Sequence, residues 1–234
     1  MKPNSPTRFA GPPLLPLAVI YTLLFLANLA ASALLRKGVP FVSPFADAEA
    51  ARAVFAANPL AVKVSAFFLF GSAVPLAIYS ATVVSRLRYL GVRAAGTNIA
   101  LFGGFAASGA TAISGLCMWV LWAPEISASL VGARVLQFIS FLFGGVGFAV
   151  AFGLLAAGIS VTSHFARLLP RWLIVLGLIV AVAGEVSSLS LITYPANFAI
   201  PVTRFVGFVW LILVGSFLPN DRRREGASPI AAMA

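Results

Sequence analysis

Hydrophobic positions in this 234-residue chain gather into long runs with short basic or polar segments between them. Each run holds about 20 residues or more, which at 1.5 Å per residue is enough to cross a hydrocarbon core about 30 Å thick. The six runs cover residues 13–35, 61–85, 95–122, 135–160, 172–193 and 201–218. The pattern predicts an all-α fold, a polytopic membrane helix bundle with about six transmembrane helices in a single membrane domain spanning residues 1–234.

The composition supports this interpretation. Hydrophobic residues make up 61% of the chain and charged residues 9%, and the mean hydropathy is +1.02. Too few residues remain outside the runs for a soluble domain. The first run is longer than the apolar core of a signal peptide, so we expect it to stay as an uncleaved anchor.

Basic residues are distributed unevenly between the two sides of the predicted bundle. Ten of the 16 Lys and Arg residues fall on one side and six on the other. The ten are Lys2, Arg8, Arg86, Arg88, Arg93, Arg167, Arg171 and Arg222, Arg223 and Arg224, and the six are Arg36, Lys37, Arg52, Lys63, Arg134 and Arg204. Because cytoplasmic loops are enriched in Lys and Arg, both termini are predicted inside.

The segment between the first two runs predicts a short helix over residues 44–58 on the outer surface. Ser43 is expected as its N-cap and Pro44 as its first residue, with Asp47 and Glu49 near the positive end of the helix dipole. This helix is either an interfacial connector or a lid over an outward-facing cavity.

Small residues at four-residue spacing in three runs predict close helix packing. These residues are Gly104, Ser108, Ala112 and Gly115, then Gly145, Ala149, Gly153 and Ala157, then Gly177, Ala181, Gly184 and Ser188. The third, fourth and fifth runs are therefore expected at the centre of the bundle. A homodimer interface through one stripe is the alternative.

Two opposite charges fall at membrane depth, where ionisable residues suggest function. Glu185 lies 14 residues after Arg171, and Arg204 lies 15 residues before Pro219. Both are roughly 21–22 Å from the cytoplasmic edge at 1.5 Å per residue, so consecutive antiparallel helices could pair them. The pair is either a buried structural ion pair or part of a proton- or ligand-binding site.

Four more polar residues complete a candidate buried site. Asn28 and Ser72 lie at a similar depth, and Arg134 and Gln137 open the fourth run. The candidate polar or ligand site therefore comprises Glu185, Arg204, Arg134, Gln137, Asn28 and Ser72.

The residue types present in the chain give little support for an enzyme or a cofactor-binding protein. The chain has one histidine, His164, and one cysteine, Cys117, so it offers no bis-histidine haem ligation and no disulfide within the chain. No catalytic residue, metal site or cofactor is expected. The net charge of +10 arises at helix ends, so membrane lipids rather than nucleic acid are the expected partners, with a second copy or another membrane protein as further possibilities.

Short segments near helix ends give the chain a family resemblance. They are 70–75 (FGSAVP), 86–91 (RLRYLG), 143–145 (FGG), 169–172 (LPRW), and 203–205 (TRF) with Trp210. The chain resembles a widespread family of bacterial multi-span membrane proteins whose domain has no assigned function. The resemblance implies a multi-pass protein of the bacterial cytoplasmic membrane and transfers no catalytic residue.

Two functions follow from these observations. One is a non-enzymatic integral membrane protein that binds a small ligand or lipid, or a membrane partner. The alternative is a small transporter or proton-coupled carrier that uses Glu185 in an outward-facing polar layer.

The predicted topology can be tested with reporter fusions. Fusions after residues 90, 166 and 225 should report a cytoplasmic position, and fusions near 50, 125 and 197 an external one. Paired phosphatase and fluorescent-protein reporters measure this directly. An external signal at residue 225 would contradict the count of six.

Overall fold

The structure, a computed structural model, describes residues 9–36 and 43–221. These residues form helices and no strand, so the predicted all-α fold is confirmed. Several basic residues used in the charge count lie outside the described residues, namely Lys2, Arg8, Lys37, Arg222, Arg223 and Arg224.

Six helical segments of the described chain are long and apolar enough to cross a membrane. The first three are α1 (Leu14–Leu35), α3 (Pro59–Tyr89) and α4 (Ala95–Val120). The fourth joins α6 (Leu130–Leu142), the π-helical turn η1 (Phe143–Gly147) and α7 (Phe148–Phe165), and the fifth joins α8 (Arg171–Val186) to the 3₁₀ turn η2 (Ser187–Leu191). The sixth consists of the 3₁₀ turn η3 (Tyr194–Phe198), α9 (Ala199–Pro201), the π-helical turn η4 (Val202–Val206) and α10 (Gly207–Phe217). The chain is therefore a multi-pass membrane helix bundle.

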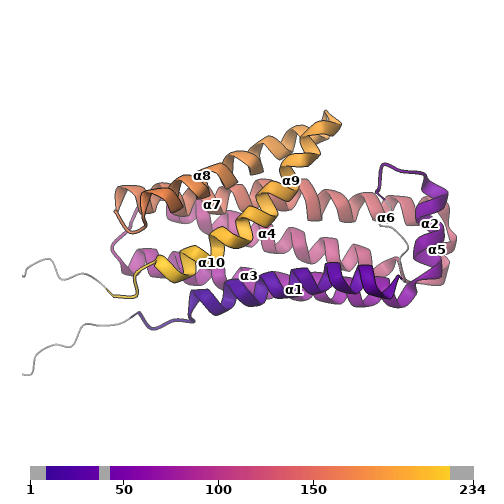
Figure 1. Cartoon of the computed structure of the whole chain (residues 1–234), viewed down its shortest axis with the longest axis horizontal. Coiled ribbons are helices and arrows are strands. Elements are labelled where there is room, and N and C mark those ends of the chain that lie inside the picture. The colour runs from indigo at the N-terminus through magenta and orange to yellow at the C-terminus, as the bar shows by residue number, and fades with distance from the viewer. Residues whose placement is uncertain (1–8, 37–42, 222–234) are drawn as a thin grey trace, which may run out of the picture.

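Both ends of the described chain lie at one end of the bundle (Figure 1). The backbone N–H of Phe9 donates to the carbonyl of Asn220 at 3.1 Å, as an even number of spans requires. The short helices α2 (Ala48–Ala57) and α5 (Pro124–Ala128) lie at the opposite end, which we call the outer end because the charge distribution predicts it outside.

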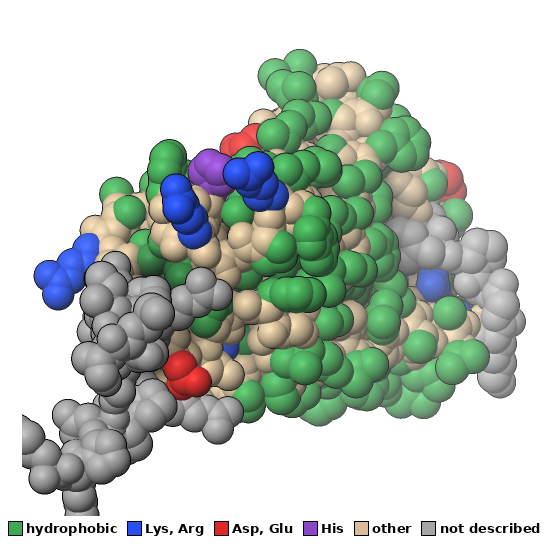
Figure 2. All heavy atoms as spheres, turned by 60° about the vertical axis from the view of Figure 1, so that its left-hand side comes forward, with side chains coloured by type: hydrophobic (Ala, Val, Ile, Leu, Met, Phe, Trp, Pro, Cys, Tyr) green, Lys and Arg blue, Asp and Glu red, His purple; other side chains and the backbone are tan. Residues whose placement is uncertain are grey.

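Basic side chains gather at the inner end. Figure 2 shows Arg and His side chains there, beside a broad hydrophobic flank. The described arginines of the two inner turns are Arg86, Arg88, Arg93, Arg167 and Arg171. The orientation of the bundle in the membrane stays a prediction.

The helices pack in a chain of neighbours that α10 closes at the inner end. The most extensive contacts join α1 to α3, α3 to α4, α4 to α7 and α7 to α8, and α10 packs against α1 and α8. Large side chains fill the core, with Tyr21, Tyr79, Phe148, Phe152 and Trp210 almost fully buried. Two of them anchor α10: the Tyr79 hydroxyl donates to the Leu211 carbonyl at 3.1 Å, and Trp210 Nε1 donates to the Leu173 carbonyl at 3.2 Å.

Glycines allow a close crossing of α7 and α8. A Cβ on Gly184 of α8 would lie 2.5 Å from the Ala149 carbonyl oxygen and 2.9 Å from the Gly153 Cα of α7. The predicted stripes of the fourth and fifth runs therefore do meet. The stripe of the third run points elsewhere, because a Cβ on Gly115 would meet the Phe70 backbone of α3 at 2.8 Å. It packs against α3 rather than toward α7.

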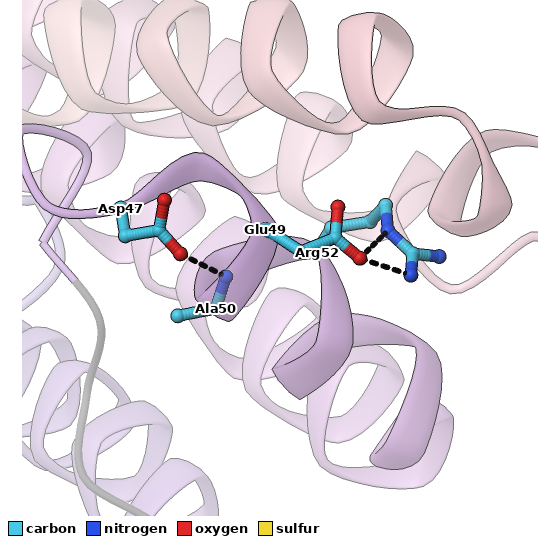
Figure 3. A network of polar contacts seen from close by, with 4 residues as sticks. All are labelled: Asp47, Glu49, Ala50 and Arg52. Atoms are coloured by element: carbon cyan, nitrogen blue, oxygen red, sulfur yellow. Dashed lines mark hydrogen bonds and ion pairs between the residues drawn. The ribbon is translucent and has the colours of Figure 1, made fainter.

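The outer helix α2 starts later than the sequence analysis expected. Its N-cap is Asp47, whose carboxylate accepts the Ala50 N–H at 2.9 Å (Figure 3), so the expected cap at Ser43 is wrong. Asp is as good a cap as Ser, and local sequence alone does not choose between them. Glu49 Oε1 accepts from Arg52 Nε at 3.0 Å, which lowers the pKa of the Glu49 carboxyl.

The Gly184 crossing yields a stability prediction. Gly184→Ala should lower the free energy of unfolding by about 1–3 kcal/mol, because the added methyl group meets backbone atoms that cannot yield without separating two helices. Thermal unfolding in detergent measures the effect. Gly109→Ala is the matched control, because its Cβ would meet nothing within 4 Å and should not lower the midpoint. Equal midpoints for the two variants would show that the crossing is not tight.

Candidate ligand cavity at the outer end

A cavity of about 350 Å³ lies inside the outer half of the bundle. Its walls come from α1, α3, α4, the α6–η1 segment, and the α9–η4 segment. Most of the lining is apolar and includes Phe25, Leu29, Leu69, Met118, Leu121, Phe141 and Ile200. Polar groups are few, so the cavity suits a largely apolar guest.

Unequal helix lengths account for the cavity. The fourth spanning segment has 36 residues, whereas the fifth and sixth have 21 and 24. The hairpin of α8 and α10 therefore ends before the outer end, and α10 lies against α1 near the inner end but runs toward α8 farther out (Figure 1). No extensive contact joins α1 to α6, so the space between them is not filled in the outer half.

Arg204 lies in the cavity wall at membrane depth. It precedes Phe217, the last residue of α10, by 13 residues, or roughly 20 Å at 1.5 Å per residue. The side chain is only 6% exposed. Its Cζ lies 3.7 Å from the ring centre of Phe148 and 4.4 Å from that of Phe25, so two aromatic faces contact the guanidinium. Such cation–π contacts stabilise a buried cation.

The two π-helical turns of the described chain meet at this arginine. Arg204 lies in η4, and its Nη2 donates to the carbonyl oxygen of Gly144 in η1. π-Turns break the regular i→i−4 ladder of hydrogen bonds and are common at functional sites. The second terminal nitrogen, Nη1, is buried and has no hydrogen-bond partner among the described residues.

The expected ion pair between Glu185 and Arg204 is wrong. No Arg204 nitrogen lies within 4.0 Å of a Glu185 oxygen, and the salt bridge found among the described residues joins Arg52 to Glu49. The Glu185 side chain is exposed and lies outside the cavity lining, close to Gly153 of α7. Equal depth along two helices is not sufficient for contact, because the helix faces must also point toward each other.

The structure places three of the six candidate residues in the cavity lining: Arg204, Asn28 and Gln137. Each is 6% exposed. Among the described residues, the structure shows no hydrogen-bond partner for the Asn28 carboxamide. This group can therefore form a hydrogen bond to a bound ligand.

Ser72 and Arg134 have structural roles outside the cavity. The Ser72 hydroxyl donates to the Leu69 carbonyl of its own helix at 2.7 Å. Arg134 Nη1 donates to the Ala46 carbonyl at 2.9 Å, which fastens the start of α2 to α6.

The outer mouth of the cavity lies beside α2. Pro44 and Phe55 contribute to the lining, and Phe45 makes edge-to-face contacts with Phe138, Phe141 and Tyr194. Arg36 also lines the mouth, where its Nε donates to the Ser32 carbonyl at 2.6 Å. The segment from Pro44 to Phe55 therefore borders the cavity.

Two aromatic residues that contact Arg204, Phe148 and Phe25, were not among the predicted site residues. Gly144 appeared only within the FGG segment. Adjacent glycines in a long apolar run were the available signal, because they allow the backbone to leave α-helical geometry.

No family model, curated protein or solved structure matches this chain. The fold and the cavity alone therefore define its class. It is a multi-pass α-helical membrane protein with an apolar internal cavity and a buried arginine in the cavity wall.

Double-mutant analysis tests the separation of Glu185 from Arg204. Glu185→Gln should change the free energy of unfolding by less than about 0.5 kcal/mol, since the side chain is exposed. Glu185→Gln and Arg204→Met should add, with a coupling energy below about 0.5 kcal/mol. Thermal unfolding of the wild type, both single variants and the double variant gives this quantity. Recovery of stability in the double variant would instead indicate a direct pair.

Proposed function

We propose that this protein binds a small lipid-like molecule in the outer cavity and catalyses no reaction on it. The observation that carries the proposal is an apolar cavity at membrane depth with a buried arginine in its wall. We also propose the bacterial cytoplasmic membrane as its location, with the basic residues at the inner end on the cytoplasmic side.

The size and lining of the cavity favour a small amphipathic guest. Its volume of about 350 Å³ lies at the lower end of the range for small-molecule sites, which is about 300–1,000 Å³. At about 30 Å³ per water-sized group, it holds roughly a dozen such groups. Aromatic and aliphatic walls with a few polar groups are typical of sites that orient an apolar ligand by one polar end.

Lipid is the natural source of the guest. Leu29 of α1 lines the cavity and is 43% exposed, so an apolar side chain of α1 borders the cavity on this side. Because α1 makes no extensive contact with α6, the acyl chain of a lipid can enter the cavity sideways from the bilayer, between these two helices.

The chemistry of the lining supports binding rather than catalysis. Among its described residues, the lining offers no carboxylate, imidazole or thiol to act as a base or nucleophile. The carrier alternative depended on Glu185, which lies outside the cavity lining, so no observation favours it.

A cavity-filling variant tests this proposal. A Cβ on Gly145 would make ordinary contacts with Ile200 Cδ1 at 3.4 Å and with Phe141 Cε2 at 3.7 Å, and all three residues line the cavity. Gly145→Leu should therefore fill the space with little strain. Gly109→Leu is the control, because position 109 is an exposed site on α4 with open space around it.

Photolabelling in nanodiscs provides the measurement. Two dodecyl probes with a diazirine in the chain are used, one with a carboxylate head and one with a hydroxyl head. At least one should label the cavity walls on α1, α4 and α6, as mapped by peptide mass spectrometry. Gly145→Leu should reduce that labelling by tenfold or more, and Gly109→Leu should leave it unchanged. Equal labelling of all three proteins, or labelling confined to outward-facing side chains, contradicts the proposal.

A further inference from the structure

The charge of Arg204 has no counterion among the described residues. No described carboxylate lies within 4.0 Å of its guanidinium, although the side chain is 94% buried, as its exposure of 6% implies. Desolvation of an arginine is unfavourable unless nearby groups replace the lost hydration. The contacts that Arg204 makes therefore decide whether the site is complete.

Those contacts satisfy only some of the hydrogen-bond donors of the guanidinium and do not balance its charge. Phe148 and Phe25 cover its faces, and the Gly144 carbonyl accepts from Nη2. Nη1 keeps its donors without an acceptor. The rings and the carbonyl are neutral, so the positive charge stays uncompensated.

An oxyanion supplies what is missing. A carboxylate or phosphate presents two or more oxygens to the planar fork of donors in a guanidinium, and charge-assisted hydrogen bonds of this kind are stronger than neutral ones. A buried water would satisfy a donor but would not balance the charge. The same limit holds for a neutral head such as an alcohol or a ketone.

We infer that the ligand of the outer cavity is a single-chain amphiphile whose oxyanion head, a carboxylate or a phosphate monoester, pairs with Arg204. This inference rests on the proposed function and adds the chemical class of the ligand. The Asn28 carboxamide of α1, which also lines the cavity, offers a further donor to the head. The chain follows Leu29, Leu69 and Ile200, and a chain longer than about ten carbons extends past α1 into the bilayer, since the cavity holds roughly a dozen groups.

Arg36 is the competing anchor for an anion. It lines the same cavity at the outer mouth, but it is only partly buried, so water can solvate its charge there. Arg204 lies among apolar and aromatic groups that cannot do so. The head is therefore assigned to Arg204, and Arg36→Gln becomes the matched control for Arg204→Gln.

Competition photolabelling in phosphatidylcholine nanodiscs tests the inference. Unlabelled dodecanoate, dodecyl phosphate and dodecanol compete against the carboxylate probe, with each compound compared at equal mole fraction in the bilayer. At least one anion should compete about tenfold to a hundredfold more strongly than dodecanol, as expected for a hydrogen bond to a charged group. Preference for dodecanoate indicates a fatty acid, and preference for dodecyl phosphate indicates a phosphate-headed lipid.

The variants assign the head to one arginine. Arg204→Gln should abolish the preference for the anion, and Arg36→Gln should retain it. Loss of the preference in Arg36→Gln alone overturns the inference, as does equal competition by dodecanol in the wild-type protein. If Arg204→Gln does not fold, competition in the wild-type protein and in Arg36→Gln still tests whether the ligand has an anionic head and whether Arg36 binds it.

Failure of this inference is distinguishable from failure of the proposed function. If dodecanol competes as well as the anions while Gly145→Leu still blocks labelling, the cavity binds a lipid-like guest with a neutral head. If neither the carboxylate nor the hydroxyl probe labels the cavity walls, the proposed function itself is wrong.

Discussion

The outer half of this protein depends on how a single arginine is accommodated inside an apolar bundle. Arg204 lies roughly 20 Å from the inner end of α10 and is buried among apolar and aromatic groups, so the protein must supply its surroundings. Two aromatic rings cover the faces of its guanidinium, and the Gly144 carbonyl of another helix accepts a hydrogen bond from Nη2. Both the arginine and the carbonyl lie in π-turns, where the backbone departs from regular helical geometry. The contact therefore links two irregular segments that would otherwise be weak points in their helices.

The cavity follows from the same arrangement. The fourth segment is long, whereas the hairpin of α8 and α10 is short and ends before the outer end, so the outer half is less filled than the inner half. The inner half is closed by large side chains such as Trp210 and Tyr79, whose polar atoms bond to backbone carbonyls of neighbouring helices. The bundle thus combines a tightly packed inner half with a hollow outer half. Glycine crossings such as Gly153 with Gly184 keep α7 and α8 close together.

Features that depend on composition along the chain were predictable. Long apolar runs predicted the six spans, and the position of Arg204 along its helix followed from counting residues to the cytoplasmic end. The rotation of each helix about its axis was not predictable, because successive residues turn by about 100° and one extra residue in a π-turn reorients everything beyond it. Glu185 and Arg204 show the consequence, since both were placed at similar depth but only Arg204 faces the cavity. Ser72 shows another limit, because a buried hydroxyl can be satisfied by its own helix.

The incomplete environment of Arg204 connects stability with ligand binding. A guanidinium that lacks a counterion makes the empty cavity less favourable than one that holds an anion. Any ligand that binds the folded state stabilises it by RT ln(1 + [L]/Kd), which is about 2.7 kcal/mol when the ligand is at 100 times its Kd. A well-packed apolar residue at position 204 would remove the burial penalty together with the means of recognising an anion. The presence of arginine there, rather than leucine or methionine, is therefore most simply explained by a guest that brings a negative charge.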